Sequence, residues 1–225
     1  MTLHSVYTTL YAHFGPQHWW PGDSPFEVMV GAVLTQNTAW TNVEKAITNL
    51  RANNALWPEA IVQLPHETLA ALIRPAGYFN VKSKRLKNYC QWYLEQGEKA
   101  SLDKWTDHDL RQGLLSVNGV GPETADDMLL YAFDRPVFVI DAYTRRLFSR
   151  LGLVVGDEGY ETLRHLFEQT LTEQTPAELI DDRDAQTKLF NEYHALIVIH
   201  AKDYCRKRPQ CENCCLVSCC RLDYS

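Results

Sequence analysis

The spacing of apolar residues constrains the fold of this chain more than any other feature. Apolar side chains recur at three- and four-residue intervals through nearly the whole sequence, and two-residue alternation is almost absent. This spacing places apolar residues on one face of successive helices, whereas alternation would indicate half-buried strands. Proline and glycine interrupt the pattern at short intervals, without a long linker or an internal repeat. The sequence therefore predicts an all-α protein whose helices are joined by short turns.

One helix has a well-defined predicted start. Ser24 is suited to the N-cap, Pro25 to the first helical position and Glu27 to the third, ahead of the apolar residues 28–34. The short apolar run 137–140 is the one candidate strand, which is too little to build a sheet. Further helices are expected near residues 41–53, 58–63, 66–73, 81–96, 107–117, 122–132, 141–151, 158–172 and 185–203.

Composition excludes several classes of protein. With 45% hydrophobic and 22% charged residues, and no apolar run approaching membrane-spanning length, the sequence is typical neither of a disordered chain nor of a membrane protein. Its 225 residues are enough for one substantial core or for two small helical lobes. The N-terminus lacks the cationic flank and continuous apolar stretch of a signal peptide, so we expect the protein to stay in the cytoplasm.

The net charge of -6 argues mildly against a nucleic-acid-binding protein, because such proteins neutralise phosphates with an excess of lysine and arginine. Basic residues nevertheless gather in three runs, which leaves a local basic face open. Ordinary solvated helix faces are the alternative interpretation of these runs. The runs are Lys82, Lys84, Arg85 and Lys87; Arg145, Arg146 and Arg150; and Lys202, Arg206, Lys207 and Arg208.

Six of the seven cysteines lie between residues 205 and 220, far denser than core packing requires. Cys205, Cys211, Cys214 and Cys220 form a C-x5-C-x2-C-x5-C loop, a pattern that suits a metal ion or an iron-sulfur cluster. Disulfides are the poorer interpretation in a cytosolic protein, and zinc bound by four thiolates is an alternative that spacing does not exclude. Cys219 is an alternative to Cys220 as the fourth ligand.

The stretch from Leu114 to Ala125 indicates a helix, a glycine-containing turn and a second helix, within about residues 107–132. Gly119 and Gly121 allow the backbone to turn tightly and to approach a ligand, and the free N–H groups that begin the following helix attract an anion. A helix-hairpin-helix motif of this kind grips the DNA backbone without reading its sequence.

A carboxylate follows the apolar run 137–140 and opens the next helix, soon after the hairpin. Taken alone, Asp141 is explained well by an N-cap role. The hairpin and the aspartate together favour a catalytic carboxylate instead.

Five motifs resemble the endonuclease III family of helix-hairpin-helix DNA glycosylases, in matching order over nearly the whole chain. They are GAVLTQNTAW, RPAGYFNVKSKRL, VNGVGPETA, VFVIDAYTRRLFSR and the closing four-cysteine loop. The resemblance implies two helical lobes with the lesion pocket between them. It assigns residues 24–133 to a central lobe, and residues 1–23 with 134–225 to a second lobe whose loop 205–220 holds a [4Fe-4S] cluster.

The resemblance also implies roles for single residues. Asp141 resembles the family's catalytic aspartate, and Gln36 resembles the side chain that fills the gap left by a flipped base. Gly119 and Gly121, followed by Thr124, resemble the DNA-gripping hairpin. These roles make physical sense, because a carboxylate stabilises the oxocarbenium-like sugar that forms when the base departs. A polar wedge also reduces the cost of unstacking.

One departure from the family bears on the reaction. Bifunctional members carry a lysine in the hairpin that forms a Schiff base with the sugar, whereas this chain has Glu123. Without the amine, the lyase step loses its nucleophile. We therefore expect a monofunctional glycosylase that uses water, with AP-lyase activity absent or weak.

Two motifs and the hairpin glutamate, Glu123, resemble the 3-methyladenine glycosylase branch of the same family. The motifs are the WWP element, Trp19-Trp20-Pro21, and LTQNT followed by an aromatic residue, here Trp40. An alkylated purine carries positive charge and stacks on electron-rich rings through cation–π attraction. Packing in the core or between lobes is the alternative role for these rings. By resemblance, the residues of the base pocket are Trp19, Trp20, Pro21, Trp40, Glu123 and Lys202.

Together these motifs predict a DNA glycosylase of base excision repair that hydrolyses the N-glycosidic bond of alkylated, 3-methyladenine-type purines in duplex DNA. We expect a monomer that is cytoplasmic and nucleoid-associated. Within the family, the alternative substrates are oxidised pyrimidines or mismatched bases. From other classes, a non-catalytic helix-hairpin-helix DNA-binding protein and a zinc-stabilised interaction module remain open. His194 and His200 have helical spacing beside apolar residues and are expected to be structural.

Overall fold

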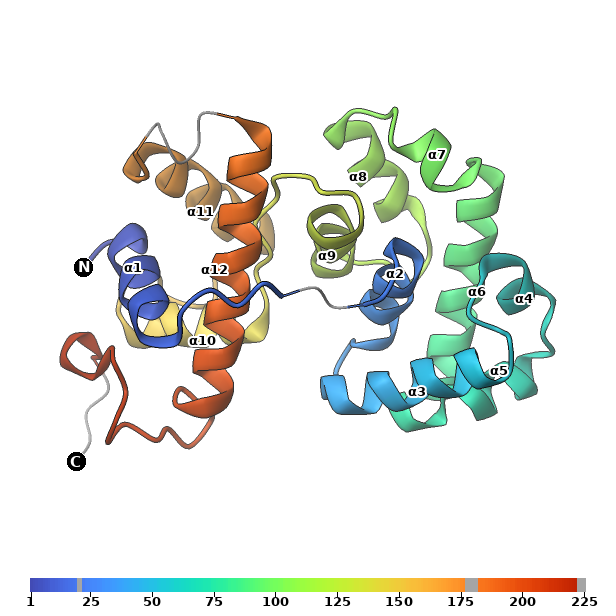
Figure 1. Cartoon of the computed structure of the whole chain (residues 1–225), viewed down its shortest axis with the longest axis horizontal. Coiled ribbons are helices and arrows are strands. Elements are labelled where there is room, and N and C mark those ends of the chain that lie inside the picture. Colours follow the sequence, from blue (N-terminus) through green and yellow to red (C-terminus); the bar gives the residue numbers. More distant parts are fainter. Residues whose placement is uncertain (20–21, 177–181, 222–225) are drawn as a thin grey trace. The chain divides into compact units, whose positions relative to one another are not determined.

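The computed structural model describes residues 1–19, 22–176 and 182–221 and divides into two units (Figure 1). Unit 1 comprises Met1–Trp19 and Asp134–Ser225, and unit 2 comprises Trp20–Phe133. Within the described ranges all regular structure is helical, which confirms the predicted all-α class. In those same ranges, no helix combines the length and the apolar character that crossing a bilayer requires.

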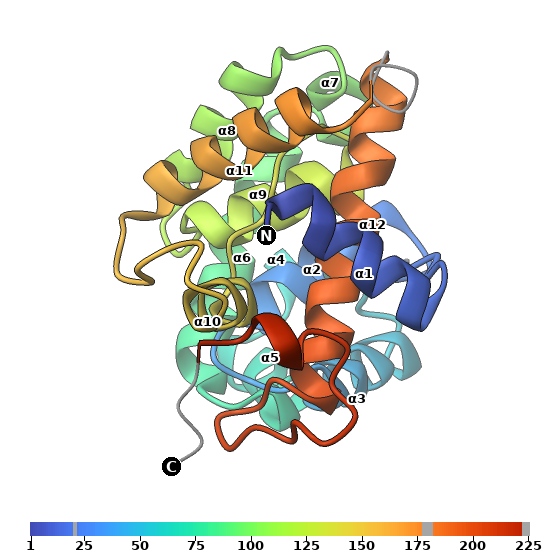
Figure 2. The ribbon, with the colours of Figure 1, turned by 90° about the vertical axis from the view of Figure 1, so that its left-hand side faces the viewer.

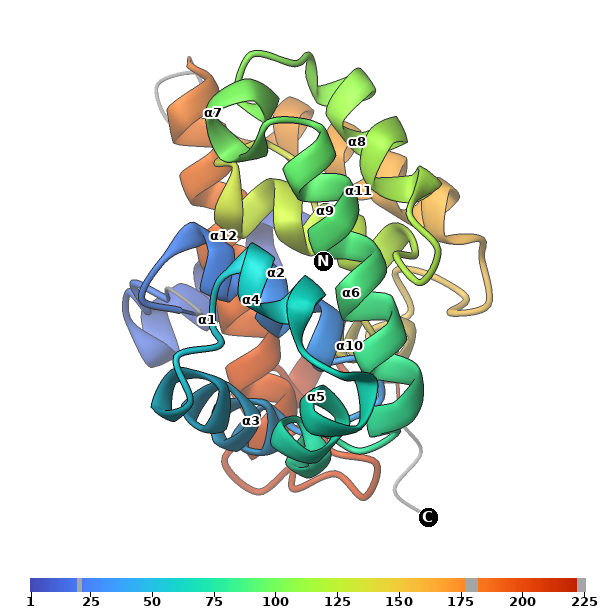
Figure 3. The same ribbon diagram turned by 90° about the vertical axis from the view of Figure 1, so that its right-hand side faces the viewer.

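Unit 2 is built around a helix, α2, whose residues are buried from Glu27 to Leu34. Its start is as predicted: the Ser24 side chain accepts a hydrogen bond from the backbone N–H of Glu27 at 3.2 Å, and Pro25 opens the helix. α2 packs against α3, α6 and α9, and the short helices α4 and α5 lie along α6 (Figure 3). The helices of unit 2 are α2 (Pro25–Leu34), α3 (Trp40–Ala52), α4 (Pro58–Gln63), α5 (His66–Leu72), the 3-10 helix η1 (Arg74–Ala76), α6 (Phe79–Glu95), α7 (Glu98–Leu102), α8 (Asp107–Ser116) and α9 (Pro122–Ala132).

Unit 1 packs a long helix, α12, against α1 and α10, and α1 also contacts α11. The C-terminal loop, red in Figure 2, lies beside α10 and the end of α12. The α1 helix was not predicted, although Leu3, Val6 and Leu10 recur at helical spacing and are buried. The helical segments of unit 1 are α1 (Leu3–Phe14), α10 (Ala142–Arg150), α11 (Tyr160–Gln174), α12 (Arg183–Asp203) and the 3-10 helix η3 (Val217–Cys219).

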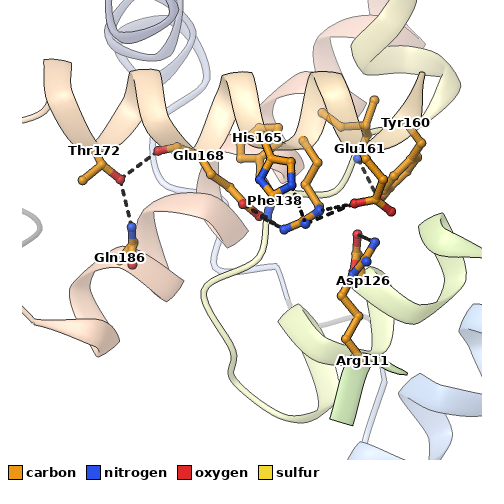
Figure 4. Close-up of polar contacts among 11 residues, drawn as sticks. Arg111, Asp126, Phe138, Tyr160, Glu161, His165, Glu168, Thr172 and Gln186 are labelled. Carbon is orange, nitrogen blue, oxygen red and sulfur yellow. Dashed lines mark hydrogen bonds and ion pairs between the residues drawn. The ribbon is translucent and has the colours of Figure 1, made fainter. Parts of the chain in front are cut away.

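The apolar run 137–140 forms neither a strand nor a helix. Side chains of α11 bind its backbone instead: Glu168 accepts a hydrogen bond from the Phe138 N–H at 3.0 Å, and the Tyr160 hydroxyl lies 3.5 Å from the Ile140 nitrogen (Figure 4). Since these bonds and the buried side chains hold the run in place, they position the residue that follows it, Asp141.

Candidate active site and cysteine-lined cavity

Asp141 is the N-cap of α10, and its carboxylate is held by the first turn of that helix. Oδ1 accepts hydrogen bonds from the Thr144 backbone N–H at 2.7 Å and from the Thr144 hydroxyl at 2.8 Å. The side chain is 14% exposed, so it is largely withdrawn from water while one oxygen is fully engaged. The N-cap role predicted from the sequence is therefore correct for Oδ1, whereas Oδ2 takes no part in the cap.

The second oxygen of Asp141 faces a histidine from α12. His194 Nε2 lies 3.6 Å from Asp141 Oδ2, and the histidine side chain is 5% exposed. Burial acts to raise the pKa of Asp141, but the adjacent His194 and the hydrogen bonds from Thr144 outweigh it, so that the pKa lies below its ordinary value. The carboxylate is accordingly ionised at neutral pH. Sequence reasoning missed His194, because its spacing is that of a buried helix residue.

An aromatic ring lies next to this pair. The Trp19 ring centroid is 6.0 Å from that of His194, with 30° between the ring planes. Trp19 is half-buried, and the structure thus brings one predicted pocket residue close to the His194–Asp141 pair. The predicted pocket residues Trp20 and Pro21 lie outside the described residues.

The other predicted pocket residues lie elsewhere in the chain's two units. Trp40 opens α3 and packs on α2, where a Cβ added to Gly31 would come within 3.0 Å of its ring. Glu123 is exposed in the first turn of α9, and Lys202 is exposed in the last turn of α12. Trp40 and Glu123 therefore belong to unit 2, whereas Trp19 and Lys202 belong to unit 1.

The hairpin joins α8 and α9, and its two glycines have different roles. Gly119 has a φ of +103°, which only glycine adopts readily, whereas Gly121 has an ordinary φ of -94° and serves as the N-cap of α9. Nothing lies within 4 Å of a Cβ built on Gly121, so its surroundings are open. The helices on either side are joined by an ion pair, in which Arg111 Nε donates to Asp126 Oδ1 at 2.7 Å (Figure 4).

Gln36 is tied directly to the hairpin. Its Nε2 donates to the carbonyl oxygen of Gly119 at 3.0 Å and to the hydroxyl of Thr124 at 3.0 Å. Its Oε1 accepts a hydrogen bond from Arg85 of α6. The stem of Arg85 covers Gly119 so closely that a Cβ there would lie 2.3 Å from Arg85 Cγ. The predicted wedge residue and the predicted backbone grip therefore form one network, in which Arg85 is an unpredicted member.

Three of the four residues in the basic run that contains Arg85 are at least half-buried, and only Lys84 is exposed. Lys82 is buried, and its ammonium group donates to the carbonyl oxygens of Leu34 at 2.9 Å and Ala76 at 2.7 Å. Lys87 donates to the carbonyl oxygens of residues 62 and 64. Long flexible stems allow these amines to reach the unpaired carbonyls at helix ends, which a charge pattern alone does not reveal.

Tyr78 is a second residue that sequence reasoning passed over. Its side chain is 72% exposed, and its backbone is left-handed with a φ of +44° immediately before α6. Exposed aromatic rings and strained backbones are both more frequent at binding sites than elsewhere. Tyr78 lies within the RPAGYFNVKSKRL motif, but the motif by itself indicated neither the exposure nor the left-handed backbone.

The C-terminal cysteines surround one cavity. Cys205, Cys211, Cys214 and Cys220 all line it, whereas Cys219 is exposed and does not. Side chains of α10 and α12 flank the sulfurs: Arg150 Nη1 is 3.2 Å from Cys205 Sγ, and His200 Nε2 is 3.2 Å from Cys214 Sγ. Among the described residues, no three metal-binding side chains are gathered closely enough to hold a single metal ion. The donor set of four thiols around a common cavity is nevertheless the one that an iron-sulfur cluster requires.

The second basic run anchors this loop to α10. Arg146 Nε donates to the carbonyl oxygen of Cys205 at 2.7 Å, and Arg150 donates to the carbonyl oxygens of Arg206 and Lys207 at 2.7 and 3.2 Å. The helix that Asp141 caps at its start is therefore bonded to the cysteine loop at its end.

Residues 30–173 match the HhH-GPD superfamily of base excision DNA repair proteins. The chain belongs to this superfamily. This chain is also 46% identical over 216 residues to a protein of Methanocaldococcus jannaschii that is provisionally named a DNA repair glycosylase. The match covers 94% of this chain and 92% of that protein. This chain is accordingly a DNA glycosylase of base excision repair.

Two solved structures share the fold of this chain. A 3-methyladenine DNA glycosylase of H. pylori, solved with bound 1,N6-ethenoadenine, is 28% identical with a TM-score of 0.77, covering 90% of this chain and 98% of that one. A non-covalent complex of endonuclease III with DNA has a TM-score of 0.78 at 21% identity, covering 98% and 96% of the two chains. This chain therefore has the endonuclease III fold, and its predicted membership of the helix-hairpin-helix DNA glycosylases is confirmed, whereas the 3-methyladenine branch stays a prediction.

Proposed function

We propose that this glycosylase hydrolyses the N-glycosidic bond of alkylated purines in duplex DNA, with Asp141 as its catalytic carboxylate. The observation that carries the proposal is a largely buried, ionised carboxylate whose Oδ1 is fixed by Thr144 while Oδ2 faces His194, and the Trp19 ring lies next to that histidine. A fixed negative charge of this kind stabilises positive charge that develops on a sugar, without reorganising during the reaction.

The chemistry needs little acid catalysis. The bond between the sugar C1′ and the purine nitrogen breaks with its electron pair going to the purine, which leaves as a neutral base because alkylation had made it cationic. Asp141 stabilises the oxocarbenium-like sugar, and water then forms a bond to C1′ and releases a proton. Electron-rich rings are suited to hold the cationic base before it leaves.

The pocket for this base is proposed to include Trp19, and Trp40 stays a prediction for the same pocket. Support comes from the half-buried Trp19 next to His194, and from the 28% identity with a 3-methyladenine DNA glycosylase of the same fold. Four other residues stay predictions for the pocket, two of which lie outside the described ranges: Trp20, Pro21, Glu123 and Lys202.

Duplex DNA is proposed to bind at the hairpin through backbone contacts. Gly121 opens α9 without a side-chain cap and in open surroundings, so the N–H groups of the first turn are suited to a phosphate. Gln36, which is hydrogen bonded to Gly119 and Thr124, is the proposed wedge. Because Glu123 stands in the hairpin where the bifunctional family members carry lysine, we expect no covalent adduct with DNA to be trapped by borohydride.

A [4Fe-4S] cluster is the proposed cofactor, held by Cys205, Cys211, Cys214 and Cys220. Such a cluster would fasten the loop 205–220 and supply structural stability, and no step of the proposed hydrolysis uses it. The lining of one cavity by these four thiols supports the assignment, and the exposure of Cys219 favours Cys220 as the fourth ligand.

The test is base release from methylated duplex DNA by wild type, Asp141→Asn and Asp182→Asn. Asn caps helices as well as Asp does, so Asp141→Asn keeps α10 but loses the charge, and we expect its rate to fall by at least about 100-fold. Asp182 caps α12 by accepting the Ala185 N–H at 2.6 Å and is the matched control, which should retain full activity.

Two outcomes would contradict the proposal. Full-rate release by Asp141→Asn would remove the carboxylate from the mechanism. Absence of 3-methyladenine and 7-methylguanine release by cluster-loaded wild type, with cleavage of a thymine-glycol duplex, would favour an oxidised-pyrimidine glycosylase instead.

A further inference from the structure

The two carboxylate oxygens of Asp141 are held differently. Oδ1 accepts both Thr144 hydrogen bonds, at 2.7 and 2.8 Å, and these stabilise the helix start. Oδ2 lies 3.6 Å from His194 Nε2. That separation is within ion-pair range but exceeds a hydrogen bond, so Oδ2 keeps lone pairs for a water molecule or the sugar. His194 is thus the side chain that faces the oxygen available for chemistry.

The surroundings make this contact more than incidental packing. His194 comes from the middle of α12, Thr144 from α10 and Trp19 from the segment after α1, so three separate parts of unit 1 meet at Asp141 or at His194. Of the described residues, His194 is the titratable group that lowers the pKa of Asp141, and Thr144, which donates both hydrogen bonds to Oδ1, is uncharged. Without such a partner, the pKa of this largely buried carboxylate would be higher, because burial acts to raise it.

We propose that His194 is a positioning residue that orients Asp141 Oδ2 and keeps the carboxylate ionised for glycosidic bond hydrolysis. The proposal rests on the function proposed above for Asp141. Through Trp19, whose ring centroid is 6.0 Å from that of His194, the same histidine also connects the carboxylate to the proposed base pocket. His194 itself forms no bond to the substrate in this scheme.

The experiment compares wild type with His194→Leu, His194→Gln and Tyr193→Phe. Leucine removes the ring nitrogen, and glutamine restores a neutral N–H donor near the position of Nε2. Tyr193 precedes His194 on α12, and its buried hydroxyl donates to the Leu3 carbonyl oxygen at 2.7 Å, so phenylalanine removes a structural bond without touching Asp141. Single-turnover release of 7-methylguanine is measured across pH 3–9 against an enzyme-free control, and binding to an uncleavable duplex is measured in parallel.

His194→Leu should lower the maximal rate by at least about 10-fold, because a displaced carboxylate is poorly aligned with the sugar. Its acid limb should move to higher pH, since one cause that lowers the Asp141 pKa is lost. His194→Gln should recover part of the rate, and Tyr193→Phe should keep the wild-type pH profile. DNA binding should stay the same in all four proteins.

A second measurement is independent of the substrate. Carboxyl-detected NMR titration of Asp141, identified by its absence in Asp141→Asn, should show protonation at higher pH in His194→Leu than in wild type. If wild type releases no alkylated base, the proposed function fails while this titration still tests the His194 contact. Unchanged Asp141 titration together with an unchanged pH–rate profile in His194→Leu would overturn the proposal.

Discussion

Replacing Gly119 with alanine should destabilise the protein much more than the same change at Gly121, although both glycines belong to the hairpin. Gly119 has a φ of +103°, and an added Cβ would lie 2.3 Å from Arg85 Cγ, 2.8 Å from its Cβ and 2.9 Å from its Cδ. Gly121 has a φ of -94° and no atom within 4 Å of an added Cβ.

The magnitude follows from two terms. A non-glycine residue forced into a sparsely populated backbone region costs about 1–3 kcal/mol, and overpacking costs about 1–3 kcal/mol. Arg85 can move in part, but its guanidinium is hydrogen bonded to Gln36. We therefore expect Gly119→Ala to lower the free energy of unfolding by about 2–4 kcal/mol. Gly121→Ala should change it by less than about 0.5 kcal/mol.

Urea unfolding monitored by tryptophan fluorescence and circular dichroism measures both variants. Arg85→Ala tests the steric term, because it removes the Cγ and Cδ overlaps but leaves the Cβ overlap and the backbone strain. In a protein that already carries Arg85→Ala, Gly119→Ala should lower the free energy of unfolding by about 1 kcal/mol less than it does in wild type. Equal stabilities for Gly119→Ala and Gly121→Ala would refute the reasoning, and an unchanged cost without the Arg85 side chain would refute its steric part.

The remaining predictions concern the cofactor and a buried lysine. Cys220→Ser should lose the bound iron and the visible absorbance of the purified protein, whereas Cys219→Ser should keep both, and a colourless wild-type protein containing zinc would reject the cluster. Burial, followed by the charge of Arg85, lowers the pKa of Lys82 to about 8 from its ordinary 10.5. Between these values the unfolded chain holds more protons than the folded one, so this group makes the free energy of unfolding rise with pH across that window. The free energy of unfolding of wild type minus that of Lys82→Met should increase from pH 8 to 10.5. If this quantity stays constant or decreases, the burial of the ammonium group is contradicted.

Local sequence patterns determined the helical class, the start of α2, the hairpin between α8 and α9, and the family. They succeed because capping, glycine turns and helical periodicity depend on residues a few positions apart. The N-cap geometry of Asp141 belongs to the same category, since its partner Thr144 is three residues away in the first turn of α10. Cysteine spacing likewise indicated the residues that line the C-terminal cavity.

Contacts between distant residues were decided only by tertiary structure. His194 looked like an ordinary buried helix residue, yet the packing of α12 against α10 places it against Asp141 Oδ2. Lys82 looked like part of a charged surface, yet it binds two carbonyl oxygens inside unit 2. Gln36 and Arg85 meet at Gly119 because α2 and α6 pack together. Spacing along a chain specifies which face of a helix is buried, but it does not specify what that face meets.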